Sequence, residues 1–203
     1  MKRNIQLADR GRETRASKPY SFRGDSGTTM ELEKKMMDSR ADQTPALETS
    51  AVLIQGAIGG IVAGVVFLIA EMIGSVLLGG ELLAPFKAFA SIPLGQMPPT
   101  IELGTALPVG FVTHFALSIL YGVIAVAIVS LVPALRSSAM TLIVATTIFG
   151  TLLWIINFFI LPDVIGRPWF KEAPMVAQFI YHAFFYGTPL GIYLAMRMGL
   201  ART

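Results

Sequence analysis

The sequence predicts an all-α membrane protein: a membrane bundle of four transmembrane helices, with a short interfacial helix between the first two and a disordered N-terminal tail. Apolar residues make up 54% of the 203 residues and charged residues only 14%, against about 25% charged in a typical soluble domain. Of the 29 formal charges, 18 fall within the first 50 residues. The remaining chain contains four long apolar runs, each with the roughly 20 residues that cross a hydrocarbon core.

The first 50 residues are polar, mixed in charge and poor in large apolar side chains, which is typical of a disordered segment. Residues 28–41 are the exception, because Thr28 and Glu31 have the spacing of a capping box and Glu31 precedes Lys35 by one helical turn. We therefore expect residues 1–50 to form a cytoplasmic, largely disordered tail with one short helix.

The transmembrane domain is predicted to cover residues 51–198. Its first apolar run carries a single charge, Glu71, and its last run is closed by Arg197. Strands are excluded because an isolated strand leaves its backbone groups unsatisfied in lipid. The four expected spans are about residues 51–79, 108–132, 139–161 and 174–196.

The distribution of basic residues predicts the orientation. With four spans, the tail, the turn at residues 133–138 and the C-terminus share one side, which holds 13 of the 16 Lys and Arg residues. Basic residues are in excess on the cytoplasmic side, so both termini are expected in the cytoplasm. Residues 81–95 are apolar but too short to span, and they predict an interfacial or re-entrant segment. Trp169 and Phe170, in the second outer loop, are predicted to anchor it at the interface.

Small residues recur every four positions along the first and fourth spans. Such a ridge lets the backbone of a neighbouring helix approach closely. The same ridges also offer contact surfaces for a homo-oligomer or a larger membrane complex. The residues assigned to helix packing are Gly56, Gly60, Gly64, Gly187 and Gly191.

Polar residues fall on the same faces and at one depth. Glu71 follows Gly64 by nearly two helical turns and so points into the bundle, where an unpaired carboxylate costs about 2.5–3.5 kcal/mol even on a lenient scale. Glu71, His114, Asn157 and His182 all lie about 7–12 Å inside the outer boundary of the membrane. Common faces and depth predict a polar pocket in the outer half of the bundle. Its candidate residues are Glu71, His114, Ser118, Tyr121, Asn157, Gln178, His182 and Tyr186.

Several functions are compatible with this pocket. The leading hypothesis is a small transport protein or an accessory protein of a membrane complex, because a carboxylate beside two imidazoles exchanges protons near neutral pH. The alternative is a structural membrane protein whose polar residues only hold the helices together. A third hypothesis is a metal or haem site, with His114 and His182 as axial ligands. No pair of ligands is spaced by one helical turn, so no cofactor and no metal ligand is assigned.

Other classes of function have less support. The chain has no cysteine, no Gly-x-Ser-x-Gly and no His-Glu-x-x-His motif, so no catalytic residue is assigned and the protein is not expected to be an enzyme. The net charge is only +3, and the basic residues are not interleaved with aromatic ones. The expected partner is therefore the lipid bilayer and not nucleic acid.

The polar and glycine motifs also carry a resemblance. The strings Gly59-Gly60-Ile-Val-Ala-Gly64, Thr113-His114-Phe115, Trp154-Ile-Ile-Asn157-Phe158 and Gln178-Phe-Ile-Tyr-His182 resemble a family of small, uncharacterised four-span bacterial inner-membrane proteins. The resemblance covers about residues 51–198. Some members are labelled sodium:proline symporter, but sodium/solute symporters have far more helices and their sodium-site motif is not found in this chain. The resemblance implies a bacterial membrane setting and no particular activity.

Overall fold

The computed structural model describes residues 30, 31, 33–35 and 49–200. Every regular element in these residues is helical, and none of them lies in a strand. Residues 30, 31 and 33–35 are helical, and the other positions of the helix expected over residues 28–41 lie outside the described residues. The chain divides between Thr44 and Pro45, so the helical body at residues 49–200 is described by itself.

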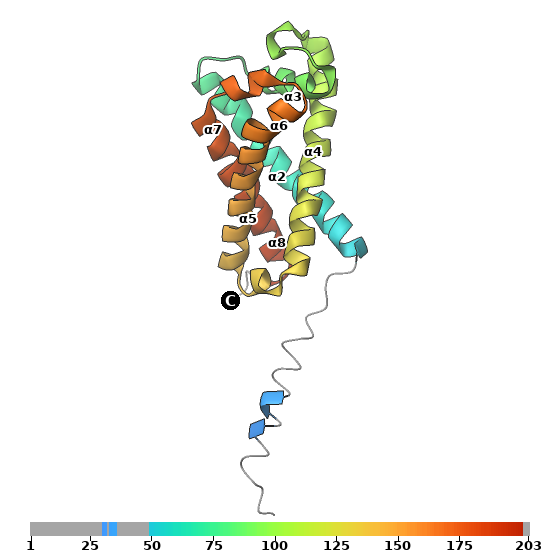
Figure 1. The fold of residues 1–203 in the computed structure, drawn as a ribbon, viewed down its shortest axis with the longest axis vertical. Helices are drawn as coiled ribbons and strands as arrows, with labels where there is room; N and C mark the ends of the chain where they lie inside the picture. Colours follow the sequence, from blue (N-terminus) through green and yellow to red (C-terminus); the bar gives the residue numbers. More distant parts are fainter. Residues whose placement is uncertain (1–29, 32, 36–48, 201–203) are drawn as a thin grey trace, which may run out of the picture. The chain divides into compact units, whose positions relative to one another are not determined.

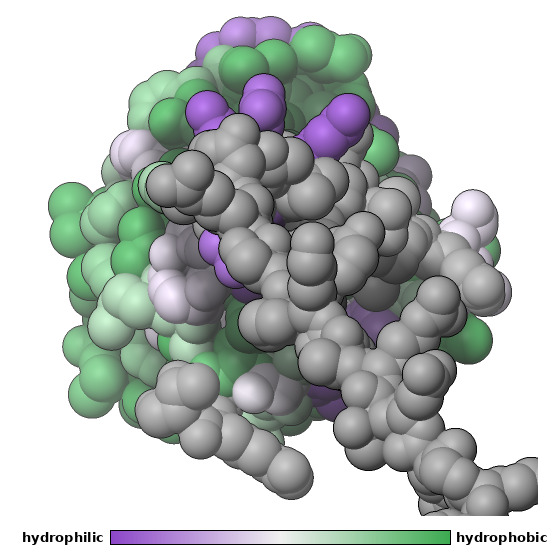
Figure 2. Space-filling view, turned by 90° about the horizontal axis from the view of Figure 1, so that it is seen from below, coloured by the Kyte–Doolittle hydropathy of each residue, from purple (hydrophilic) through white to green (hydrophobic). Residues whose placement is uncertain are grey.

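Three helices of this body are long and apolar enough to cross a membrane. Their outward faces carry exposed leucine, isoleucine and valine side chains, and hydrophobic residues occupy the flanks of the body in Figure 2. This length and composition are those of a membrane protein. The three helices are α2 (Thr49–Leu77), α4 (Leu103–Leu131) and the stretch Ala139–Val164, which comprises α5 (Ala139–Ile155), the π-helix η3 (Ile156–Ile160) and α6 (Leu161–Val164).

The segment at the fourth predicted span is helical throughout but is not a single α-helix. The sequence predicts a kink near Phe185, because Pro189 has no N–H to donate one turn back. The structure has a π-helix at this position. The segment consists of α7 (Met175–Ile180), the π-helix η5 (Tyr181–Gly187) and α8 (Thr188–Arg197).

In both π-helices, a single residue separates the last residue from a proline. In the first, the Leu161 N–H bonds to the Ile156 carbonyl, five residues back, and Pro162 follows. In the second, the Thr188 N–H bonds to the Ala183 carbonyl, and Pro189 follows. The wider turn re-satisfies backbone groups that a proline would otherwise leave without partners in lipid. Such π-turns are rare and frequently mark functional sites.

Short helices connect the long ones. Between α2 and α4, α3 ends at Gly95, whose φ of 70° is left-handed and whose N–H caps the Ser91 carbonyl. This αL geometry at a helix end favours glycine. In Figure 1, α3 and α6 lie at the same end of the bundle. The connecting helices are α3 (Ala84–Leu94), η1 (Pro98–Thr100), η2 (Pro133–Arg136) and η4 (Pro168–Glu172).

The long helices form two tight pairs, α2 with α4 and α5 with the η5–α8 segment. Glycines permit both contacts, because a Cβ at Gly60 would collide with the Ser118 backbone and one at Gly150 with the His182 backbone. The pairs meet where α2 packs against η5 and α8, whereas the consecutive helices α4 and α5 pack little against each other. Figure 1 shows α5 and α4 with α2 between and behind them.

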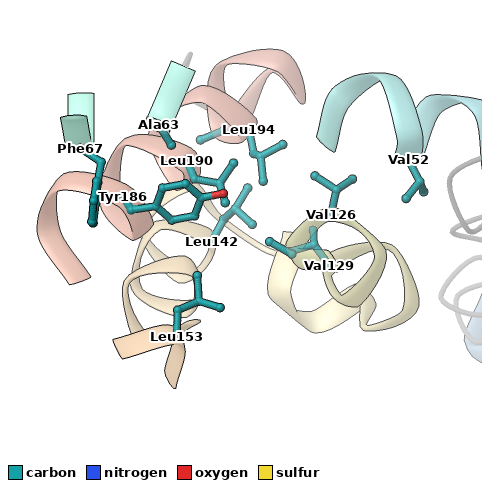
Figure 3. Packing of buried hydrophobic residues seen from close by; sticks show 12 residues of the cluster. Val52, Ala63, Phe67, Val126, Val129, Leu142, Leu153, Tyr186, Leu190 and Leu194 are labelled. Carbon is teal, nitrogen blue, oxygen red and sulfur yellow. The ribbon is translucent and has the colours of Figure 1, made fainter. Parts of the chain in front are cut away.

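The largest cluster of buried apolar residues lies where the two pairs meet. Leu142, Leu190 and Leu194 are fully buried, and Figure 3 shows the ring of Tyr186 lying among these side chains. Because the outward faces are also apolar, the core is distinguished by close packing and not by hydrophobicity, as is usual for helices in lipid.

The close contact at Gly150 yields a stability prediction. Gly150→Ala should lower the free energy of unfolding in detergent by about 1–3 kcal/mol, the usual cost of overpacking, because the new methyl group meets backbone that cannot move aside. Gly104→Ala is the matched control, since a Cβ there meets nothing within 4 Å among the described residues. The control should be neutral or more stable by about 0.5–1 kcal/mol. Equal effects of the two substitutions in thermal or denaturant unfolding would contradict this packing.

Candidate functional site

A cavity of about 160 Å³ lies under the α3 end of the bundle, and side chains from every long helix line it. All eight polar residues nominated for the pocket are among its lining residues. Six of them come from the fourth helical segment and from α4, one from α2 and one from η3. The structure therefore brings the nominated set together: Glu71, His114, Ser118, Tyr121, Asn157, Gln178, His182 and Tyr186.

A chain of hydrogen bonds connects three helical segments at the cavity. The Tyr121 hydroxyl donates to Asn157 Oδ1 at 2.8 Å, and Asn157 Nδ2 lies 3.3 Å from His182 Nε2. His182 Nδ1 donates to the Gln178 carbonyl at 2.8 Å. Because a carbonyl only accepts, the proton of a neutral His182 is on Nδ1, and Nε2 accepts from the asparagine. This chain joins α4 to η3, the π-helix that continues α5, whereas α4 and α5 themselves pack little against each other.

Two further hydrogen bonds attach the lining side chains to the backbone of neighbouring helices. His114 Nε2 donates to the Gly64 carbonyl at 2.9 Å, which leaves Nδ1 of a neutral ring as an acceptor. The Tyr186 hydroxyl donates to the Ser118 carbonyl at 2.6 Å. Since Gly64 lacks a side chain, the imidazole reaches this carbonyl directly, and the glycine ridge of α2 thus positions a polar group of the cavity.

Glu71 differs from the other polar residues of the site. It is 8% exposed, and the side chain of Gln178 is the polar group beside its carboxyl. Neither ion pair found in the described residues involves it, because these pairs are Lys87–Glu81 and Lys171–Asp163. The Glu71 carboxyl group therefore lies in the cavity wall without a fixed, positively charged partner.

The aromatic part of the lining was not predicted from the sequence. Phe67, Phe89, Phe158 and Phe170 all line the cavity. The Phe89 ring centroid is 4.6 Å from that of His114, and the Phe158 centroid is 5.5 Å from that of His182. Of these four phenylalanines, only Phe67 could have been predicted from the sequence, because it lies one helical turn before Glu71 on the same face. The other three come from segments whose position depends on tertiary contacts.

The segment between α6 and α7 contributes Ile165, Phe170 and Ala173 to the cavity lining and is fastened to α3. The Trp169 indole donates to Ser91 Oγ at 3.1 Å, and Arg167 Nε donates to the Ile92 carbonyl at 3.1 Å. The Arg167 guanidinium also lies 5.8 Å from the centre of the Trp169 ring. The sequence predicted interface anchors at Trp169 and Phe170, whereas the structure gives both of them partners within the protein.

The glycines assigned to helix packing are all used inside the chain. A Cβ at Gly56, Gly60 or Gly64 would meet α4, and one at Gly187 or Gly191 would meet α5. These glycine contacts lie within the chain, and association with a second copy stays a prediction.

The geometry gives no support to a metal or haem site. Within the described residues, no three His, Cys, Asp or Glu side chains come together as a metal ion requires. Both ring nitrogens of His182 are engaged in hydrogen bonds, so neither is free to bind iron. Of the nominated groups, only His114 has a ring nitrogen without a partner among the described residues.

The chain matches no protein-family model, no curated protein and no solved structure. What can be inferred about its activity therefore comes from the cavity and the residues that line it.

The hydrogen bond between Tyr121 and Asn157 predicts energetic coupling. In a double-mutant cycle of Tyr121→Phe with Asn157→Leu, the coupling should be on the order of 1 kcal/mol, within the range measured in membranes of up to about 1.7 kcal/mol. The reason is that each substitution removes the same bond. The control cycle combines Asn157→Leu with Tyr193→Phe, because Tyr193 bonds to Gln55 instead. A coupling no larger than that of the control, measured by unfolding in detergent, would exclude the bond.

Proposed function

We propose that this chain is a small transport or membrane-complex accessory protein that binds an organic ligand in the cavity beneath α3. The observation that carries the proposal is the convergence of the nominated polar side chains on one cavity. They were selected by helix face and by depth in the membrane, two properties that do not depend on each other. Ionisable and polar residues inside a membrane bundle are costly and usually mark a ligand or ion pathway.

The chemistry of the lining favours ligand binding over catalysis. Apart from its eight polar residues, the cavity is lined by aromatic and aliphatic side chains. An apolar pocket with a few polar groups is the usual form of a small-molecule site. No lining residue is a cysteine or a lysine, so nucleophiles of these types are missing among the described lining residues. Ligand binding is therefore the role that we propose for the cavity.

We place the protein in the bacterial inner membrane with four spans. The continuous helical segment from Met175 to Arg197 is long enough at about 1.5 Å per residue to serve as the fourth. On this topology α3 lies at the outer interface, and both termini are cytoplasmic because basic residues are concentrated on that side. The family of small inner-membrane proteins that the sequence resembles fits this setting.

A second function has its own supporting observation. The chain Tyr121–Asn157–His182–Gln178 is what a purely structural polar core would show, because interhelical hydrogen bonds fix the register of membrane helices. On this alternative the cavity is a packing defect and has no ligand. Occupancy of the cavity distinguishes the two functions.

Filling the cavity tests the proposal. Isobutylbenzene, a neutral aromatic probe, should raise the unfolding temperature of the wild-type protein, since a ligand at a hundred times its dissociation constant stabilises by about 2.7 kcal/mol. Ala88→Phe places a ring in the cavity, which Ala88 lines, and should abolish this shift. Val112→Phe, on an exposed face of α4, is the control for partitioning of the probe into micelles. An equal shift in all three proteins would mean that the cavity takes no ligand.

Introduced cysteines test the topology, because the natural chain has none. Glu172→Cys, exposed in η4, should react with a membrane-impermeant maleimide on intact spheroplasts. Ser137→Cys, exposed in the turn before α5, should react only after the membrane is permeabilised. The reverse pattern would invert the orientation, and labelling of both residues from one side would exclude four spans.

A further inference from the structure

The cavity contains a carboxylate with no fixed counter-charge. Among the described residues that line it there is neither a lysine nor an arginine. The two histidines do not supply the charge either, since neither imidazole forms an ion pair with Glu71. His182 uses both ring nitrogens in hydrogen bonds, and His114 uses one to bond the Gly64 carbonyl. Ionising a buried carboxyl group without a partner is expensive in lipid, so a ligand that supplies a positive charge removes the cost of ionising Glu71.

Two groups of the cavity lining that have no hydrogen-bond partner among the described residues are acceptors. Gln178 Oε1 is buried and has no hydrogen-bond partner among the described residues, and His114 Nδ1 is likewise without one. With the Glu71 carboxylate, three lining residues thus have acceptor capacity to spare. A ligand that donates hydrogen bonds matches these acceptors.

The aromatic rings supply the second element of cation recognition. They come from four different segments: Phe67 from α2, Phe89 from α3, Phe158 from η3 and Phe170 from η4. Ring faces attract ammonium groups by about 0.5–2 kcal/mol, most strongly where water is excluded. The same rings take up the apolar body of a ligand, so a molecule with one ammonium group and an aromatic or branched hydrocarbon part satisfies the whole lining.

From these contacts we infer that the cavity binds a lipophilic organic ammonium ion, with its N–H groups toward Glu71 and its apolar part among the phenylalanine rings. The inference deepens the proposed function and depends on it, because it names the ligand class of the same site. A divalent metal ion is disfavoured, since no three ligating side chains converge among the described residues.

The two probes for the test differ only in charge and N–H. N,N-dimethylbenzylamine is protonated at neutral pH, and isobutylbenzene has the same heavy-atom skeleton with carbon in place of nitrogen. Affinities for both are measured with the full-length protein in detergent, from the rise in unfolding temperature with probe concentration. Wild-type protein should bind the ammonium probe roughly tenfold or more tightly than its neutral counterpart, as expected for a charge-assisted hydrogen bond in an apolar site.

Three variants assign this preference to one side chain. Glu71→Gln keeps the shape and a hydrogen-bonding group but removes the charge, and it should lose the preference for the ammonium probe while keeping the neutral one within about threefold. Glu71→Asp keeps the charge and should retain the preference even if its stability falls. Glu102→Gln, an exposed carboxylate outside the cavity lining, should behave as wild type.

The outcomes separate this inference from the proposed function. Selective loss of ammonium binding in Glu71→Gln supports both. Equal affinity for the two probes, unchanged in Glu71→Gln, overturns the cation inference and leaves a neutral-ligand cavity. Absence of binding by either probe to the wild type overturns both.

Discussion

Helices in lipid gain nothing from moving apolar side chains away from water, so they associate where their backbones can come close. In this protein that constraint is met at two glycine contacts, Gly60 against the Ser118 backbone and Gly150 against the backbone of His182. Each contact closes one helix pair. The remaining contact, between α4 and α5, has no such closure. The loose contact between α4 and α5 leaves room for a cavity, because close backbone packing is confined to the two helix pairs.

Much of this arrangement could be predicted from the sequence, because the governing signals are local. The length of an apolar run specifies a spanning helix, and a glycine every fourth residue specifies the face that meets a neighbour. Depth follows from counting residues at a fixed rise. These three rules were sufficient to choose Glu71, His114, Asn157 and His182 from four separate segments, and the structure places all four on one cavity.

The remaining features depend on contacts between distant segments, and local rules do not reach them. The attachment of the segment between α6 and α7 to α3 requires that Trp169 meet Ser91 and that Arg167 meet Ile92, 78 and 75 residues apart in the chain. The π-helices had a local cause in Pro162 and Pro189, but a proline is equally compatible with a kink. The neighbours that the glycine ridges meet inside the chain also lie on distant segments.

The polar residues of the site divide into two sets by their bonding. Tyr121, Asn157 and His182 are bonded to one another and lie on α4 and on the two π-helices, where the backbone itself departs from α geometry. Their mutual hydrogen bonds stabilise the side of the bundle where α4 and α5 pack little. They leave few free hydrogen-bonding atoms for a ligand. Glu71 lies on α2, in a regular helix backed by a glycine ridge, and has no fixed counter-charge. A rigid support for a carboxyl group without a counter-charge and a bonded network opposite it are what a ligand site requires.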